Sequence, residues 1–196
     1  MKLVILDRDG TINVDSDEFI KTPEEWQPLP GSLEAIARMN HAGWHVAVAS
    51  NQSGLGRGLF DVATLNAIHA KMHKMLAAIG GRVDAVFYCP HTPDDQCQCR
   101  KPLPGLFEQI GERFGVDLRT TPVVGDTARD LVAGAAVGCQ PHLVLTGKAE
   151  SLRPTLPALQ GTPVLPGGYP EGTRVHKDLA AFADWLITRS PAPRPA

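Results

Sequence analysis

The feature that most constrains the fold is a regular alternation of short apolar runs with helical patterns. The apolar runs have the length of buried strands and lie at residues 3–6, 44–50, 83–88, 123–124 and 142–145. Apolar residues at helical spacing lie at residues 32–43, 61–80, 104–114, 128–137 and 179–188. Ser32 and Asp61 are expected to cap the first two of these helices. This alternation predicts a doubly wound parallel sheet with right-handed crossovers. We therefore expect an α/β fold of three layers, α/β/α, with functional groups at the carboxyl ends of the strands.

The length of 196 residues fits one domain, and the sequence contains no internal repeat. We expect this domain to span residues 1–190. Within it, residues 151–172 are rich in proline and glycine and are expected to form a surface loop. Residues 191–196 are expected to be a disordered tail.

Charge and hydropathy argue against several classes of protein. The net charge is −2 and no block of lysine and arginine occurs, which disfavours a nucleic-acid or anionic-membrane surface. The first apolar run stops after four residues at Asp7, so it does not resemble a signal peptide. No stretch approaches the ~18 apolar residues of a membrane span. We expect a cytoplasmic protein that acts on a small molecule, and we expect it to be a monomer.

Polar residues follow four of the predicted strands at the point where each strand ends. Asp7-Arg8-Asp9-Gly10-Thr11 follows the first strand, Ser50-Asn51 ends the second, and Gly125-Asp126 ends the fourth. Lys101 lies on the segment that leads from the third strand. An Asp-Gly turn alone would account for the first group. Four strand ends with polar groups at one edge of the sheet instead indicate a site.

These side chains suit phosphoryl transfer. A carboxylate such as Asp7 can attack phosphorus and form an aspartyl-phosphate. A second carboxylate two residues further on, Asp9, can protonate the leaving oxygen and then take a proton from water. Mg²⁺ prefers oxygen ligands and can be held by few carboxylates together with water and phosphate, a role that suits Asp126. Lysine and hydroxyl donors would stabilise charge on the phosphate oxygens.

A second group of reactive residues occupies the segment 89–99. Three cysteines and one histidine within eleven residues match a closed Cys3His zinc site with the ligands Cys89, His91, Cys97 and Cys99. A redox Cys97-x-Cys99 pair and a disulfide are the alternatives; a reducing cytosol disfavours both, and both leave the histidine unexplained. With no ligand position left for water, zinc is expected to be structural and to order a loop that has no core of its own.

The motifs at the strand ends resemble, in order and spacing, the four motifs of the haloacid dehalogenase superfamily of phosphatases. The resemblance covers residues 1 to about 147 and rests on Asp7-x-Asp9-Gly10-Thr11, Ser50-Asn51, Lys101 and Gly125-Asp126. It implies that Asp7 is the nucleophile and Asp9 the general acid and base. It implies that Ser50 and Lys101 hold the transferring phosphoryl group. It also implies a Mg²⁺ site formed by Asp7, the backbone carbonyl of Asp9, and Asp126.

The cysteine segment narrows this resemblance. A Cys-x-His…Cys-x-Cys-Arg-Lys-Pro segment in such a chain is similar to two related groups, the heptose-1,7-bisphosphate 7-phosphatases and the histidinol-phosphate phosphatases. Residues 51–58, 100–105 and 145–148 look like the heptose enzymes. The resemblance implies that Arg100 recognises the substrate, and that the substrate site comprises Asp15, Ser16, Asp17, Glu18, Ser50, Asn51, Gln52, Ser53, Arg100 and Lys101.

The resemblance thus implies a Mg²⁺-dependent phosphatase that removes the 7-phosphate of D-glycero-D-manno-heptose 1,7-bisphosphate. Its product would enter the synthesis of ADP- or GDP-heptose for lipopolysaccharide core or surface glycans. Arg57, Arg100 or Lys148 could meet the other phosphate. The motifs are separated by about forty residues from Asp9 to Ser50 and about fifty from there to Lys101, which leaves no room for a separate cap domain.

Three other functions are alternatives. They are a histidinol-phosphate phosphatase, a polynucleotide 3′-phosphatase, which the lack of a basic face disfavours, and a non-catalytic zinc-bound binding module, which the intact catalytic set disfavours. Asp130, one helical turn after Asp126, is expected to be a capping or supporting residue rather than a ligand. Histidines without a partner pattern are expected to be surface or core residues; they are His41, His69, His73, His142 and His176.

Overall fold

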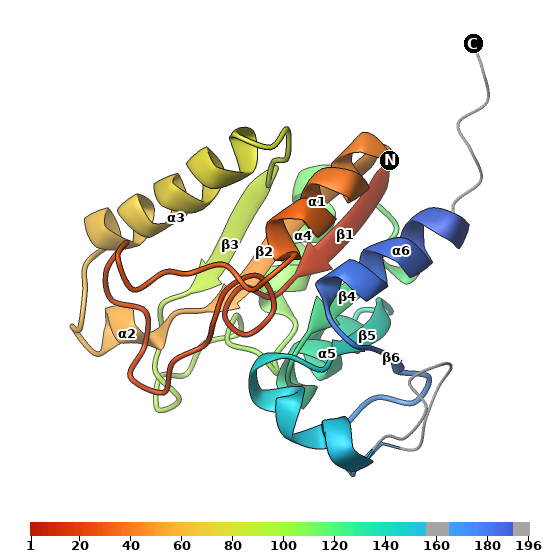
Figure 1. The fold of residues 1–196 in the computed structure, drawn as a ribbon. Helices are drawn as coiled ribbons and strands as arrows, with labels where there is room; N and C mark the ends of the chain where they lie inside the picture. Colours follow the sequence, from red (N-terminus) through yellow and green to blue (C-terminus); the bar gives the residue numbers. More distant parts are fainter. Residues whose placement is uncertain (156–164, 190–196) are drawn as a thin grey trace.

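The computed structural model describes residues 1–155 and 165–189, and its strands form one parallel sheet in the order β3-β2-β1-β4-β5-β6 (Figure 1). The strands are β1 (Lys2–Leu6), β2 (Trp44–Asn51), β3 (Ala85–Cys89), β4 (Pro122–Gly125), β5 (Gln140–Val144) and β6 (Arg174–His176). The α-helices are α1 (Ser32–His41), α2 (Ser53–Gly56), α3 (Val62–Ala77), α4 (Gly105–Phe114), α5 (Ala128–Ala135) and α6 (Leu179–Arg189). Two 3₁₀ helices, η1 (Leu118–Thr120) and η2 (Gly147–Thr155), complete the described elements.

Alternate residues of the central strand enter two cores, one on each face of the sheet. Val4 and Leu6 belong to the core that α1, α3 and α6 cover. Leu3 and Ile5 belong to the core that α4 and α5 cover. All four side chains are buried, because a parallel sheet with helices on both faces keeps both sets of side chains away from water. The fold is therefore the doubly wound, three-layer α/β/α sheet that the sequence predicts (Figure 1).

The helix starts follow the predicted capping only in part. Asp61 caps α3 as expected, since its carboxylate accepts a hydrogen bond from the backbone N–H of Thr64 at 2.8 Å. The prediction that Ser32 caps α1 is wrong. Its hydroxyl donates to the carbonyl of Ile12 at 2.6 Å, and Gly31, with a φ of 75°, occupies the cap position instead. The serine hydroxyl therefore ties the helix to the loop that follows β1.

The second half of the chain contains elements that the sequence did not predict. β6 pairs with β5 through only three residues and carries Arg174 and His176 at its ends, so it lacks an apolar run that would indicate a strand. Residues 151–155 of the expected surface loop belong to η2, and the glycine-rich segment after β2 contains the single turn α2. Residues 156–164 of that loop and the expected tail 191–196 lie outside the described residues.

The connection from β1 to α1 is a loop that folds over the sheet edge rather than a cap domain. Among its described residues, isolated bridges link Asn13 to Asp9 and to Pro28.

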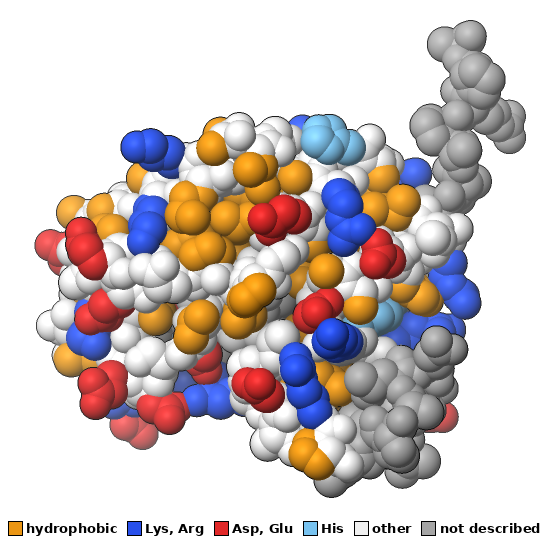
Figure 2. All heavy atoms as spheres, viewed as in Figure 1, with side chains coloured by type: hydrophobic (Ala, Val, Ile, Leu, Met, Phe, Trp, Pro, Cys, Tyr) orange, Lys and Arg blue, Asp and Glu red, His pale blue; other side chains and the backbone are white. Residues whose placement is uncertain are grey.

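On the face in Figure 2, lysine and arginine side chains are interspersed with aspartate and glutamate side chains. None of the described helices combines the length and apolar character needed to cross a bilayer.

Candidate active site

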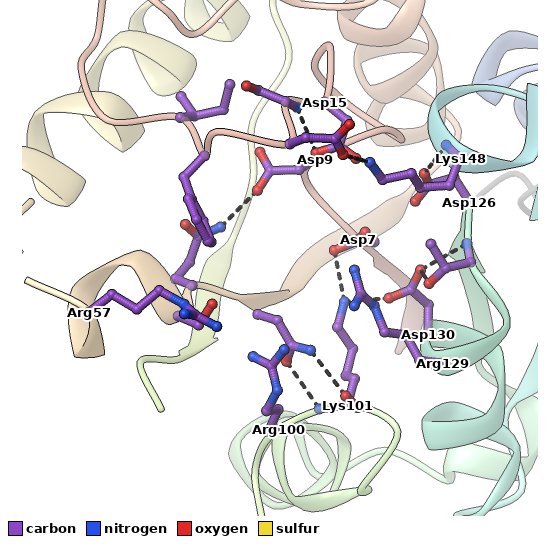
Figure 3. Close-up of a pocket in the computed structure, with 18 residues that line it drawn as sticks. Asp7, Asp9, Asp15, Arg57, Arg100, Lys101, Asp126, Arg129, Asp130 and Lys148 are labelled. Carbon is purple, nitrogen blue, oxygen red and sulfur yellow. Dashed lines mark hydrogen bonds and ion pairs between the residues drawn. The ribbon is translucent and has the colours of Figure 1, made fainter. Parts of the chain in front are cut away.

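Polar groups from all four predicted strand ends line one cavity of about 300 Å³ (Figure 3). β1 lies between β2 and β4 in the sheet, so Asp7 is flanked by Asn51 at the end of β2 and by Asp126 after β4. Lys101, on the segment between β3 and α4, reaches the same place. The parallel sheet thus brings together residues that are more than a hundred positions apart in the sequence.

Lys101 connects the acidic residues of this cavity. Its Nζ lies 2.8 Å from Asp7 Oδ1 and 2.7 Å from Asp130 Oδ1, and it donates to the carbonyl of Ala49 at 2.7 Å. The lysine side chain is only 2 % exposed. Burial opposes its charged form, but Asp130 and Asp7 outweigh burial and raise the pKa of Lys101. The ammonium group therefore stays charged beside the predicted nucleophile.

The acidic residues exceed what one lysine can neutralise. Burial, and next the carboxylate of Asp130, raise the pKa of Asp7 to about 7. Burial, and next the carboxylate of Asp7, raise the pKa of Asp126 to about 8. Carboxylate oxygens of Asp7, Asp126 and Asp130 lie within 4.8 Å of one another. Such a crowded group of carboxylates favours binding of a cation, and its oxygen ligands suit Mg²⁺.

The backbone packs tightly around Asp126 and leaves one of its oxygens free. A Cβ at Gly10 or at Gly147 would overlap the Asp126 carboxylate, and both glycines have positive φ angles of 85° and 53°. The backbone N–H of Lys148 donates to Asp126 Oδ2 at 2.8 Å. Asp126 Oδ1 is buried and has no hydrogen-bond partner among the described residues. A buried carboxylate oxygen without a partner fits a role as metal ligand.

Asp130 supports Lys101 and the start of α5. Its Oδ1 pairs with the lysine, and its Oδ2 accepts from both the backbone N–H and the hydroxyl of Thr127 in a capping box. Both oxygens therefore have partners. The sequence predicts a capping or supporting residue here, and the capping box confirms it.

The carboxylate of Asp9 is held by Arg8 and two amide side chains. The guanidinium of Arg8 donates from Nε to Oδ1 at 3.0 Å and from Nη2 to Oδ2 at 3.1 Å. Asn13 and Gln52 each donate one further hydrogen bond at 2.9 Å. Burial favours the protonated acid, but Arg8 and these amides outweigh burial and lower the pKa of Asp9. Asp7 and Asp9, two residues apart, thus have environments that shift their pKa values in opposite directions.

The end of β2 holds the lysine segment in register. Asn51 makes two reciprocal hydrogen bonds with the backbone of Lys101, one from Lys101 N–H at 3.0 Å and one to its carbonyl at 3.1 Å. Gln52 and Ser53 line the cavity. Ser50 is buried, and its hydroxyl accepts from Gln52 at 2.7 Å. Ser50 does not itself line the cavity in the described structure.

The loop after β1 forms one wall of the cavity mouth. Asp15, Ser16 and Asp17 line the cavity, whereas Glu18 does not. Lys148 pairs with Asp15 at 3.4 Å and also with Asp17, so the acidic loop is joined to the segment after β5. Phe19 and Ile20, which come directly after these acidic residues, also line the cavity. No pattern in the sequence separates these two residues from ordinary loop residues.

Arginines form the opposite wall, and one of them is not predicted by the sequence motifs. Arg57, Arg100 and Arg129 all line the cavity (Figure 3). Arg129 lies in the first turn of α5, where an exposed arginine is ordinarily a solvated surface residue. Burial, and next the charge of Arg129, lower the pKa of Arg100. Like charges that approach one another at the mouth of a cavity favour an anionic ligand between them.

The four residues of the predicted zinc site converge as well. His91 Nδ1 lies 3.4 Å from Cys89 Sγ and 3.3 Å from Cys99 Sγ, and Cys97 Sγ lies 3.8 Å from Cys89 Sγ. All four ligand atoms lie within 4.8 Å of one another. The cysteines are free thiols, so the disulfide alternative is not supported. For zinc–ligand bonds of about 2.0–2.3 Å, tetrahedral geometry requires ligand atoms about 3.3–3.8 Å apart. The three distances above fit this range, and the Sγ atoms of Cys89 and Cys99, 3.0 Å apart, lie closer together.

Comparison with known proteins agrees with this geometry. Residues 98–167 match the family described as HAD-hydrolase-like. The D-glycero-beta-D-manno-heptose-1,7-bisphosphate 7-phosphatase of Bordetella bronchiseptica is 59% identical over 95% of this chain and 98% of its own length. The enzyme of the same name from Pseudomonas aeruginosa is 53% identical over 94% of this chain and 97% of its own length.

A solved structure extends the comparison to three dimensions. The D,D-heptose 1.7-bisphosphate phosphatase of B. bronchiseptica, crystallised with magnesium and phosphate, is 57% identical to this chain. It superposes with a TM-score of 0.89, covering 97% of this chain and 100% of that one. The chain therefore belongs to the heptose-1,7-bisphosphate 7-phosphatase family, within the haloacid dehalogenase superfamily.

Proposed function

We propose that the chain is a Mg²⁺-dependent phosphatase that hydrolyses the 7-phosphate of D-glycero-D-manno-heptose 1,7-bisphosphate. The observation that carries the proposal is the contact of Lys101 Nζ with Asp7, at 2.8 Å, inside a cavity that also holds Asp9 and Asp126. The relatives at 46–59% identity carry the name of this activity. Its product would serve the synthesis of nucleotide-activated heptose.

Asp7, the backbone carbonyl of Asp9 and Asp126 would hold the Mg²⁺ ion. The buried, unpartnered Oδ1 of Asp126 and the crowded carboxylates support this assignment. The magnesium in the related B. bronchiseptica structure supports it further. A bound Mg²⁺ supplies positive charge that orients and neutralises phosphate oxygens.

The protein groups then divide the reaction between them. Asp7 attacks the phosphorus of the 7-phosphate, so that a bond from phosphorus to the carboxylate forms while the bond to the sugar oxygen breaks. Asp9 gives a proton to the departing oxygen and then takes one from the water that hydrolyses the aspartyl-phosphate. Lys101 stabilises the negative charge on the phosphoryl oxygens, and the reciprocal bonds with Asn51 fix its backbone.

The arginine wall is the proposed site of the phosphate that is not removed. Arg100 and Arg129 line the same cavity as Asp7, and no ion pair of Arg129 occurs within the part of the chain that is described. A planar guanidinium can bind phosphate through two parallel hydrogen bonds. Histidinol phosphate has no second phosphate and carries an ammonium group, so this wall favours the bisphosphate over that alternative.

We also propose that Cys89, His91, Cys97 and Cys99 bind a structural zinc ion. The spacing of the four ligand atoms supports this assignment, and four protein ligands leave no position for a substrate. Zinc would hold the segment that precedes Arg100 and Lys101.

Free thiols in such a site suit a reducing compartment, so we place the protein in the cytoplasm. We expect a monomer, which size-exclusion chromatography would test.

A substrate panel tests the proposed function. Purified protein with Mg²⁺ is given both anomers of the heptose bisphosphate, and histidinol phosphate, and each reaction is followed by phosphorus NMR. We expect the 7-phosphate signal to be converted to free phosphate while the 1-phosphate signal persists. Faster release from histidinol phosphate, or loss of the 1-phosphate first, would contradict the proposal.

A further inference from the structure

A histidine outside the zinc and carboxylate clusters contacts the acid–base machinery. Arg8 lies between the two proposed catalytic aspartates in sequence, and its side chain is fully buried. Its guanidinium makes two hydrogen bonds to Asp9 and a third, from Nη1, to Nε2 of His69 at 3.1 Å. His69 belongs to α3 and is itself 8 % exposed.

The direction of this third hydrogen bond is fixed by chemistry. An arginine side chain is always protonated and has only donors, so His69 Nε2 must be the acceptor. The imidazole must then be neutral and carry its proton on Nδ1. Burial, and next the charge of Arg8, lower the pKa of His69 to about 4, which keeps the ring neutral at physiological pH.

The contact constrains how Arg8 presents itself to Asp9. A guanidinium is planar, so fixing Nη1 on His69 also sets the plane in which Nε and Nη2 face the carboxylate. His69 and Arg8 are 61 positions apart in the sequence. The residues near His69 on the same face of α3, Leu65, Ile68 and Met72, are all buried. The helix therefore supplies a rigid anchor for the arginine.

We infer that His69 is a positioning residue that orients Asp9 for proton transfer by fixing the guanidinium of Arg8. The inference rests on the proposed function, because it requires Asp9 to act as the general acid. Without the acceptor on His69, Nη1 of Arg8 would remain buried and unpaired, and Arg8 would move to find another partner. Asp9 would then lose the alignment of its two charge-assisted hydrogen bonds from Arg8.

The test compares His69→Leu with His69→Gln, because glutamine places an acceptor oxygen near the position of Nε2 and leucine does not. Exposed His73, one turn further along α3, provides the matched control His73→Leu. Each variant is assayed for kcat/KM on the heptose bisphosphate and on an aryl phosphate. An aryl oxide leaves without a proton, so it depends little on a general acid. The ratio of the two kcat/KM values does not depend on the folded fraction.

We expect His69→Leu to lower kcat/KM for the sugar phosphate about tenfold and for the aryl phosphate less than about twofold, a part of the ~100- to 10,000-fold that a general acid contributes. We expect His69→Gln and His73→Leu to keep the wild-type ratio. An unchanged ratio in His69→Leu, or a ratio in His69→Gln as low as in His69→Leu, would overturn the inference.

The outcome for the proposed function is separate. A wild-type enzyme that hydrolyses other alkyl phosphates but not the heptose bisphosphate would contradict the proposed substrate. The kcat/KM ratio would then be measured with the best alkyl phosphate in place of the sugar phosphate. The ratios in His69→Leu and His69→Gln would still support or overturn the inference about His69.

Discussion

Two clusters of side chains, which we propose to hold or surround metal ions, lie at the carboxyl end of the sheet, but different forces hold them in place. The carboxylates of Asp7, Asp126 and Asp130 follow strands or begin a helix, and both cores of the sheet fix those elements. The proposed zinc ligands Cys97 and Cys99 lie in a loop without helix or strand among its described residues, half-buried against the edge of one core.

Because one cluster is held by the packed cores and the other lies in a loop, we expect the two clusters to respond differently to loss of metal. The carboxylate cluster is positioned by packing that exists without Mg²⁺, so removal of Mg²⁺ should abolish activity and leave the fold intact. The Cys3His loop has little apolar surface of its own, so removal of zinc should loosen it. Each of the following experiments either breaks or sharpens this contrast.

The largest expected effect is that of Asp7→Asn. The variant keeps the shape of the side chain but cannot attack phosphorus, so kcat should fall at least about a thousandfold. It also removes one of several repelling charges, so the melting temperature should not fall. Phosphate release and thermal unfolding measure the two effects.

The exposed Asp94→Asn is the matched control for this substitution and should keep full activity. Turnover within about tenfold of wild type in Asp7→Asn would contradict the assignment of the nucleophile.

The next largest effect is expected from Cys97→Ser. Zinc content should fall from about one equivalent to near zero, and activity about ten- to hundredfold, because Arg100 and Lys101 follow the loop directly. Metal analysis, melting temperature and kcat/KM measure these changes.

Cys139→Ala is the control, since Cys139 is buried outside the Cys3His cluster and should not affect zinc. A protein that is purified without chelator and contains no zinc would remove the contrast between the two clusters.

Much of this site could be predicted from sequence because each carboxylate follows a buried strand. Asp7, Asp9 and Asp126 are adjacent to apolar runs, and a parallel sheet brings such positions together whatever the details of packing. Arg129 and His69 could not be predicted in this way. Each lies on a helix, and the direction in which it points depends on the capping box at Thr127 and on the burial of Arg8.

The fold shows the same division. Five strands have apolar runs that the sequence displays, whereas β6 has only three residues and depends on pairing with β5. Serine is a residue type that often caps helices, but the hydroxyl of Ser32 donates a tertiary hydrogen bond to the carbonyl of Ile12 instead. Local patterns thus predict the elements that both cores bury, and tertiary contacts decide the remainder.

A smaller effect is expected from Arg129→Ala. Loss of a charged hydrogen bond worth about 1–2 kcal/mol should raise KM for the bisphosphate about tenfold, with kcat nearly unchanged. KM for a sugar monophosphate should change little, because that substrate has no second phosphate. Steady-state kinetics on both substrates provides the measurement.

Arg113→Ala, at an exposed position in the last turn of α4, is the matched control. An equal rise of KM for both substrates would place Arg129 outside the proposed phosphate site.

The smallest expected effect is on the pH dependence of stability, to which buried histidines of the sheet contribute independently of the zinc loop. His142 and His176 are buried 3.0 Å apart beneath α6, and burial followed by Arg174 lowers the pKa of His176 to about 4. The unfolded chain binds the proton at a higher pH than the folded one. The stabilisation is therefore complete above about pH 6.5 and is lost as the pH falls from there toward 4.

His176→Phe should reduce this dependence by about 1 kcal/mol at pH 5.5. Urea unfolding in the Cys97→Ser background provides the measurement, because acid-induced loss of zinc is then absent. An exposed control, His41→Ala, should leave the slope unchanged. A slope equal to that of the parent protein in His176→Phe would assign the acid sensitivity elsewhere.

The most direct test of the account is to trap the phosphorylated enzyme. Wild-type protein with Mg²⁺ and the heptose bisphosphate is quenched in acid within a single turnover, and the phosphorylated peptide is identified by mass spectrometry. The account predicts phosphate on Asp7 and on no other residue, in an amount that rises and decays at the rates of turnover. Product formation without protein-bound phosphate, or with phosphate on another side chain, would contradict it.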